Sequence, residues 1–244
     1  MGEKIIFKNP QGLKLVGIID QSSADKMIIM AHGFTGDKDE RGRFIKAAEA
    51  FKKPGYSVLR FDFAGSGESD ACGVTLEGQV GDLKAAIQFA KRNGYKEIVL
   101  FGHSLGGLCA LLSYEPPIKT MVLTAPVTTG GVPDSLKDPV LQKEIKERGF
   151  VIIKRSREFR LEKKYLEERI AVNQKEMLSR VKCPVLIIMG DLDKNVRVED
   201  SKRAIGFLPK ESKLELLRGA DHNLNAQYDI VISLTLDWLK KIGG

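Results

Sequence analysis

Short runs of hydrophobic residues alternate with longer amphipathic stretches along most of the chain. Two runs at 5–7 and 13–19, joined by Asn9-Pro10-Gln11-Gly12, predict an N-terminal β-hairpin. Further short apolar runs predict buried strands at 27–31, 57–61, 98–101, 121–124, 185–189 and 214–217. Helical spacing predicts helices at 43–53, 76–92, 105–113, 199–207 and 226–241. This alternation predicts an α/β protein with a mostly parallel eight-stranded sheet and helices on both faces.

One interval interrupts the alternation of strands and helices. Between Pro126 and Cys183 the sequence becomes polar and charged, with a β-like run at 150–153 and a helical pattern at 161–170. Such a segment is too long for a plain loop. We therefore predict a small inserted cap at 130–180, with residues 1–129 and 181–244 forming the core domain.

Composition and length place few limits beyond those of an ordinary globular protein. Of the 244 residues, 43% are hydrophobic and 29% are charged, as expected for one α/β domain. There is no long apolar span and no basic-then-apolar leader, so we expect a cytoplasmic protein without membrane association. The three cysteines show no metal-binding spacing, so we expect neither a metal site nor a disulfide framework.

The net charge of +7 raises the question of nucleic-acid binding. Residues 137–182 contain 14 Lys and Arg but 8 Asp and Glu, and so carry six of the seven net positive charges. Acidic residues are interleaved with the basic ones, which is typical of solvated helix faces with i,i+4 pairing. No nucleic-acid motif accompanies the charge, so we do not expect nucleic-acid binding.

The pentapeptide Gly102-His103-Ser104-Leu105-Gly106 follows a predicted strand directly and precedes a predicted helix. Taken alone, Gly-x-Ser-x-Gly could be a loop without chemistry. In this context it predicts a nucleophile elbow, a sharp strand-to-helix turn that exposes the serine and needs glycines beside it. Ser104 is then the candidate nucleophile.

A serine nucleophile needs a histidine base and an acid that orients it. Of three histidines, His32 ends the third strand, and His103 is expected to point away from the nucleophile's side. His222 follows the last strand and arrives from a separate loop, so we take it as the base. The order Ser, Asp, His along the chain agrees with this choice.

The loop after the strand at 185–189 offers two candidate acids. Asp193 lies far enough around the turn to reach His222, whereas Asp191 is still leaving the strand. We favour Asp193 and interpret Asp191 as a turn-capping residue. Asp200 is expected near a helix start.

Two backbone N–H groups are candidates for an oxyanion hole. The Leu105 N–H lies at the start of a helix, and Phe34 lies in the loop after the third strand. A second glycine cluster at 62–69 could suggest a dinucleotide-binding loop. Because Asp70 stands where that motif needs a third small residue, we interpret the cluster as a structural turn.

These motifs resemble the α/β-hydrolase family over nearly the whole chain. The matching segments, in order, are HGFTG, FDFAGSGES, GHSLGG, GDLDKNV and GADHN. The residues in these segments and the length of the cap look most like those of the feruloyl/cinnamoyl esterase group of small carboxylesterases. The resemblance implies nucleophile Ser104, base His222, acid Asp193, oxyanion donors Phe34 and Leu105, and no cofactor.

The predicted cap departs from that group because it is mainly Lys, Arg and Glu. Phe150, Phe159 and Tyr165 are its aromatic candidates for contacting a substrate ring. We expect a serine carboxylesterase that acts on small acyl or hydroxycinnamoyl-type esters, with a small-molecule ester as its partner. A peptidase or thioesterase with the same triad stays open, as does a non-catalytic ligand-binding protein on this fold. The oligomeric state is also open, a homodimer included.

Overall fold

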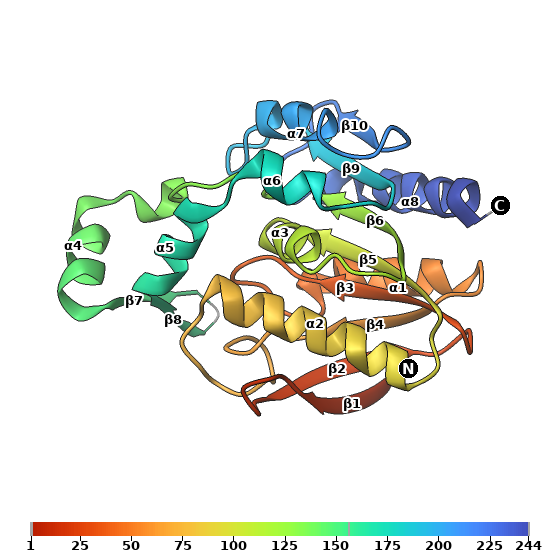
Figure 1. The fold of residues 1–244 in the computed structure, drawn as a ribbon, viewed down its shortest axis with the longest axis horizontal. Coiled ribbons are helices and arrows are strands. Elements are labelled where there is room, and N and C mark those ends of the chain that lie inside the picture. The colour runs from red at the N-terminus through yellow and green to blue at the C-terminus, as the bar shows by residue number, and fades with distance from the viewer. Residues whose placement is uncertain (1, 156, 244) are drawn as a thin grey trace.

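The computed structural model describes residues 2–155 and 157–243 and confirms the predicted fold class. An eight-stranded sheet has the order β1-β2-β4-β3-β5-β6-β9-β10 (Figure 1). The strands are β1 (Glu3–Lys8), β2 (Lys14–Asp20), β3 (Lys26–Ala31), β4 (Ser57–Phe61), β5 (Glu97–His103), β6 (Ile118–Thr124), β9 (Val185–Gly190) and β10 (Lys213–Leu217). The hairpin β1–β2 is antiparallel and β2 pairs antiparallel with β4. From β4 to β10 every neighbouring pair is parallel.

Helices cover both faces of the sheet. One face packs against α1 (Arg43–Lys52) and α8 (Tyr228–Gly243), and the other against α2 (Leu76–Arg92), α3 (Leu105–Leu112) and α7 (Val198–Ile205). Strand β3 is apolar from Met27 to Ala31 because both of its faces are buried. Met27 and Ile29 belong to one core, and Ile28 and Met30 to the other. Full burial of each such side chain contributes about 1.5–3 kcal/mol.

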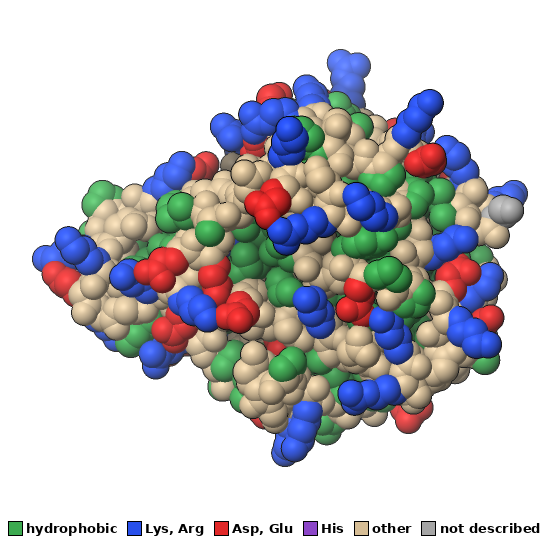
Figure 2. All heavy atoms as spheres, viewed as in Figure 1, with side chains coloured by type: hydrophobic (Ala, Val, Ile, Leu, Met, Phe, Trp, Pro, Cys, Tyr) green, Lys and Arg blue, Asp and Glu red, His purple; other side chains and the backbone are tan. Residues whose placement is uncertain are grey.

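A long insertion between β6 and β9 builds the cap. It comprises η2 (Asp134–Leu136), α4 (Pro139–Arg148), the hairpin β7 (Phe150–Lys154) and β8 (Glu158–Glu162), α5 (Lys163–Ala171) and α6 (Gln174–Ser179). In Figure 1 it extends from one end of the molecule. Its exposed charges form i,i+4 pairs such as Arg148–Glu144, and Figure 2 shows both signs interspersed over its outer surface. The predicted helix at 161–170 begins two residues later because 158–162 form a strand.

The cap is attached to the core by backbone and side-chain contacts. The Val74 N–H donates to the Arg160 carbonyl at 2.8 Å, and the Glu162 N–H donates to the Val74 carbonyl at 3.2 Å. Val151 and Leu161 are fully buried in the same hydrophobic cluster as the core helices α2 and α3.

Within the described residues, no helix is both long and apolar enough to cross a bilayer.

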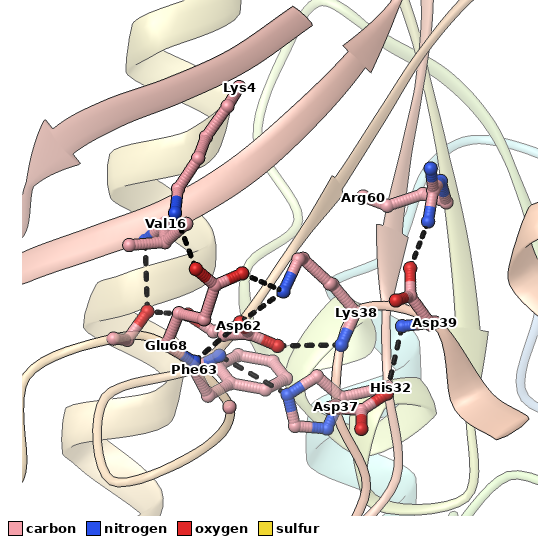
Figure 3. Close-up of polar contacts among 12 residues, drawn as sticks. Lys4, Val16, His32, Asp37, Lys38, Asp39, Arg60, Asp62, Phe63 and Glu68 are labelled. Carbon is pink, nitrogen blue, oxygen red and sulfur yellow. Dashed lines mark hydrogen bonds and ion pairs between the residues drawn. The ribbon is translucent and has the colours of Figure 1, made fainter. Parts of the chain in front are cut away.

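The loops after β3 and β4 are joined by buried ionic contacts (Figure 3). Asp62 is fully buried and accepts hydrogen bonds from the Lys38 N–H at 2.7 Å and Lys38 Nζ at 3.0 Å. The Glu68 N–H donates to the same carboxylate at 2.9 Å. Gly67 has φ +46°, and a Cβ there would lie about 2.1 Å from the Asp62 carboxyl. The glycine cluster at 62–69 is therefore a turn wrapped around Asp62.

Candidate active site

Ser104 occupies a strained turn between β5 and α3. Its backbone has φ +53° and ψ −116°, outside the regions that a serine normally adopts. The flanking glycines are required by close backbone approach. A Cβ on Gly106 would lie 2.1 Å from the Ala31 carbonyl oxygen, and one on Gly102 would lie 2.7 Å from the Gly106 carbonyl oxygen. The Gly-x-Ser-x-Gly spacing thus forms the elbow geometry, with the half-buried Ser104 at the carboxyl end of β5.

The structure brings the three predicted triad residues into one chain of hydrogen bonds. His222 Nε2 lies 3.0 Å from Ser104 Oγ, and His222 Nδ1 lies 2.8 Å from Asp193 Oδ2. The Asp193 side chain is fully buried, and its Oδ1 accepts the N–H groups of Asn195 and Val196 at 2.8 and 2.9 Å. An ionised carboxylate only accepts hydrogen bonds, so Nδ1 carries the imidazole proton. Nε2 is then free to accept the proton of the serine hydroxyl.

The two other candidate acids lie elsewhere. Asp191 is exposed, and its Oδ1 accepts the Gly219 N–H at 2.6 Å, which closes the turn next to the loop that carries His222. Asp200 lies in the first turn of α7, as expected, and pairs with Arg197 and Arg203. Neither carboxylate makes a hydrogen bond to His222 within the described residues, whereas Asp193 does.

The remaining histidines are structural neighbours of the site. His32 Nε2 accepts the Phe63 N–H at 3.2 Å and joins the loops after β3 and β4 (Figure 3). His103 does not point away as expected, because its ring centroid lies 5.2 Å from that of His222. Its Nδ1 lies 3.2 Å from the Thr124 carbonyl. Burial lowers the pKa of His103 to about 4, so a neutral ring adjoins the base and does not repel a proton gained by His222.

Both predicted oxyanion donors border the same cavity as Ser104. Leu105 is the first residue of α3, where a backbone N–H has no intrahelical partner and the helix dipole favours negative charge. Phe34 follows Gly33, and a Cβ on Gly33 would lie 3.2 Å from Ser104 Cβ. The loop after β3 therefore passes directly beside the nucleophile.

A buried ion pair links the two loops on either side of Ser104, and the sequence analysis missed it. The Gly33 N–H donates to Glu40 Oε1 at 2.6 Å, and Arg43 pairs with Glu40 Oε2 at 2.6 Å. The Arg43 guanidinium also donates to the carbonyl of Asn223, the residue after His222. The one sequence signal was the charged run DKDERGR, which reads equally well as an exposed turn. This pair links the loop after β3 to the loop that carries His222.

A cavity of about 1080 Å³ between core and cap opens onto Ser104 and His222. Of the three predicted aromatic contacts, Tyr165 alone lines it. Phe159 is buried beneath it and packs edge-on against Phe34 at 5.6 Å. Phe150 lies outside the cavity, where the guanidinium groups of Arg148 and Arg160 cover its ring. The prediction for Phe150 and Phe159 is wrong, because the two rings lie on opposite faces of the hairpin β7–β8 and neither borders the cavity.

The described residues hold no group of three or more His, Cys, Asp or Glu side chains arranged to bind a metal ion. The polar groups that the site itself presents are a hydroxyl, an imidazole, a carboxylate and backbone N–H groups.

Comparisons with known proteins agree with the fold. The thermostable monoacylglycerol lipase of Bacillus sp. (strain H-257) is 24% identical over 238 residues, which cover 89% of this chain and 91% of the lipase. The quorum-quenching protein AidA of Acinetobacter baumannii is 30% identical over 125 residues, or 48% of this chain and 40% of AidA. The structure of Est1E of Butyrivibrio proteoclasticus with ferulic acid bound matches with TM-score 0.76 at 23% identity, covering 96% of this chain and 98% of Est1E.

The α/β hydrolase GrgF from a Penicillium species matches with TM-score 0.83 at 18% identity, covering 99% of this chain and 98% of GrgF. At these identities the solved structures establish the fold. A family match extends over residues 22–227, which include the elbow at Ser104 and the loops that carry Phe34, Asp193 and His222. The chain belongs to the serine aminopeptidase S33 family of α/β hydrolases.

Proposed function

We propose that this protein is a serine carboxylesterase that hydrolyses small-molecule esters through an acyl-enzyme. The observation that carries the proposal is the continuous hydrogen-bond chain from Ser104 through His222 to Asp193 at the floor of the cavity. A binding protein has no need for a strained serine, an oriented imidazole and a buried carboxylate in one line. The kinship with a monoacylglycerol lipase supports ester hydrolysis as the reaction.

In the proposed mechanism, Ser104 Oγ attacks the ester carbonyl while His222 Nε2 takes its proton. The carbonyl oxygen becomes an oxyanion that accepts hydrogen bonds from the Leu105 and Phe34 N–H groups. As the tetrahedral intermediate collapses, the carbon–oxygen bond to the leaving alcohol breaks and His222 donates its proton to that oxygen. Water then attacks the acyl-serine with His222 as base, which releases the acid and restores Ser104.

The acyl group that we propose is small or aromatic, with hydroxycinnamoyl esters as one class. The cavity volume exceeds what such an acid needs, and Tyr165 provides a ring in its wall. The phenol of Tyr165 stays neutral, because burial raises its pKa to about 12. Est1E, whose structure holds ferulic acid, supports this class. Amide and thioester hydrolysis are the competing activities, since a thiohydrolase of Aspergillus aculeatus is 28% identical over 162 residues.

The decisive experiment combines a substrate panel with Ser104→Ala. We expect turnover of 4-nitrophenyl and methyl hydroxycinnamate esters to exceed that of aminoacyl anilides and acyl thioesters, and Ser104→Ala to lower ester turnover by about 10⁴-fold or more. A fluorophosphonate should add one label, on Ser104. Ser113→Ala is the matched control, because this buried serine ends α3 and its hydroxyl lacks a hydrogen-bond partner within the described residues. Near-normal turnover by Ser104→Ala would refute the proposal.

A further inference from the structure

Arg169 is a buried cation without a carboxylate partner within the described residues. It lies on α5 of the cap, lines the cavity that opens onto Ser104, and is 5% exposed. One guanidinium nitrogen, Nη1, donates to the Thr129 carbonyl at 3.0 Å. Its Nε is buried and has no acceptor among these residues. Because buried charges are normally paired, the guanidinium has unused capacity to bind an anion.

The Arg169 guanidinium is bound to the same chain segment that contacts the backbone of Ser104. Thr129, which anchors Arg169, lies two residues after Val127, whose N–H donates to the Ser104 carbonyl at 3.0 Å. The phenol of Tyr165, one helical turn before Arg169, lines the same cavity and is neutral. Tyr165 therefore supplies no negative charge to Arg169.

The other charges around the cavity do not neutralise Arg169. The acids that line it are Asp134, which pairs with Lys137, and Asp200, which pairs with Arg197 and Arg203. Cationic side chains are in excess along the lining, namely Lys137, Lys154, Arg155, Arg169, Lys194 and Arg197. This contrasts with the outer surface of the cap, where both signs are mixed (Figure 2). The cavity therefore favours an anionic ligand.

We infer that the cavity takes esters that carry a carboxylate away from the scissile bond, and that Arg169 binds this carboxylate. This inference rests on the proposed esterase function. A carboxylate fits because a guanidinium offers two parallel N–H donors to its two oxygens, and one negative charge balances the one buried positive charge. Water is largely excluded from this part of the wall, so the ion pair is stronger than it would be at the surface.

Two matched ester pairs test the inference. Mono-4-nitrophenyl adipate and its methyl ester place the charge on the acyl side, whereas 4-acetoxybenzoate and methyl 4-acetoxybenzoate place it on the alcohol side. We expect the wild-type enzyme to prefer the charged member of at least one pair by about 10-fold or more in kcat/KM, mainly through KM. Hydrogen bonds to charged groups have strengths that correspond to about 10- to 150-fold. Added NaCl should reduce the preference.

Substitutions of Arg169 test whether this residue causes the preference for the charged esters. Arg169→Met should abolish the preference by raising KM for each charged ester to about the value for its methyl ester, and Arg169→Lys should retain a part because it keeps the charge but loses the planar fork. Arg148→Met is the matched control, since Arg148 lies on the cap outside the cavity and pairs with Glu144. It should keep the full preference. Thermal unfolding of each variant confirms that the compared proteins are folded.

Binding measurements separate this inference from the esterase proposal. Adipate and 4-hydroxybenzoate should each be titrated into the wild-type protein and into Arg169→Met by calorimetry, with adipamide as the uncharged probe. Carboxylate binding that is lost in Arg169→Met, without turnover of any ester, would support the site and refute the esterase. Turnover of the neutral esters without any preference for either charged ester would overturn the inference and leave the esterase standing. A preference that survives in Arg169→Met would also overturn it; if that variant does not fold, an undiminished preference in Arg169→Lys does so.

Discussion

Replacing Asp193 with asparagine changes one atom's chemistry and should reverse the hydrogen-bond direction at His222. Oδ1 of Asp193 accepts two backbone N–H groups, from Asn195 and Val196. In the variant the single carbonyl oxygen stays with these two donors, so the amide NH₂ faces His222 Nδ1. Since NH₂ only donates there, Nδ1 must accept, and the imidazole proton moves to Nε2. Nε2 then points a proton at Ser104 Oγ and cannot act as the base.

The size of the loss follows from the contacts that would have to be given up. Turning the amide to restore the correct tautomer would set its NH₂ against two N–H donors, which costs about 1–3 kcal/mol for each unsatisfied group. The variant also lacks the carboxylate charge that stabilises the imidazolium, a hydrogen bond of about 1.5–3 kcal/mol. Together these effects amount to about 3.5–9 kcal/mol, so we expect kcat to fall by about 10³-fold or more at about 1.36 kcal/mol per tenfold. The corresponding change in another Ser-His-Asp enzyme lowers kcat by about 10⁴-fold.

The assay is steady-state hydrolysis of 4-nitrophenyl butyrate at pH 7.5, with folded protein verified by circular dichroism. Asp191→Asn is the matched control, because Asp191 belongs to the same turn but is exposed and accepts one hydrogen bond from Gly219, which an amide oxygen can also accept. We expect the control to stay within about 3-fold of the wild type. If Asp193→Asn stays within about 10-fold, or if Asp191→Asn loses more, Asp193 is not the orienting acid.

Two further predictions concern the buried groups around the site. Glu40→Gln should destabilise the fold by about 3 kcal/mol, because it leaves the buried Arg43 without a charged partner. At temperatures where the variant stays folded, it should also lower kcat more than it changes KM. Urea unfolding measures the first effect and ester kinetics the second, and an unchanged kcat would refute a positioning role for Glu40. His103→Asn should remove a pH dependence of stability. With a folded pKa of about 4 and an ordinary value of 6.5, the unfolded chain binds more protons between these pH values, so the wild type should lose about 2 kcal/mol relative to the variant from pH 7 to pH 4.5. Urea unfolding at both pH values checks the sign, and Asp82, whose pKa burial raises to about 6, cancels in the difference because both proteins contain it.

The fold could be predicted from sequence because its signals are local. The central strands β3, β5 and β9 each contain an apolar run of at least four residues, as expected for a strand that is buried on both faces. Phe34, Ser104 and Asp193 each follow the end of one of these three strands. Strand β8 was missed although its signal was present. Glu158, Arg160 and Glu162 alternate with Phe159 and Leu161, and this period of two is typical of a ribbon with one buried face. The neighbouring charges of α5 favoured a helical interpretation of the same residues.

The parts of the site that could not be predicted depend on contacts between distant segments. Arg43 reaches a carbonyl 180 residues further along the chain, and Arg169 reaches one 40 residues earlier. On the sequence alone both look like ordinary charges on an amphipathic helix, for which solvent is the expected partner. His103 likewise borders His222 only because the sheet brings the two loops together.

The way the cap is held indicates that the cavity is largely formed before substrate arrives. Glu168 on α5 accepts the N–H groups of Leu76 and Glu77 at 2.7 and 3.1 Å, and so caps the first turn of α2 in the core. Together with the backbone pairing of Val74 to β8 and the burial of Leu161 in the core, this contact would be lost if the cap swung away. When the cavity is pre-formed, substrate binding orders few protein groups, so little of the binding free energy is lost to ordering the protein. It also means that substitutions in the cap change specificity and stability together, so a specificity change there is informative only beside a measured unfolding free energy.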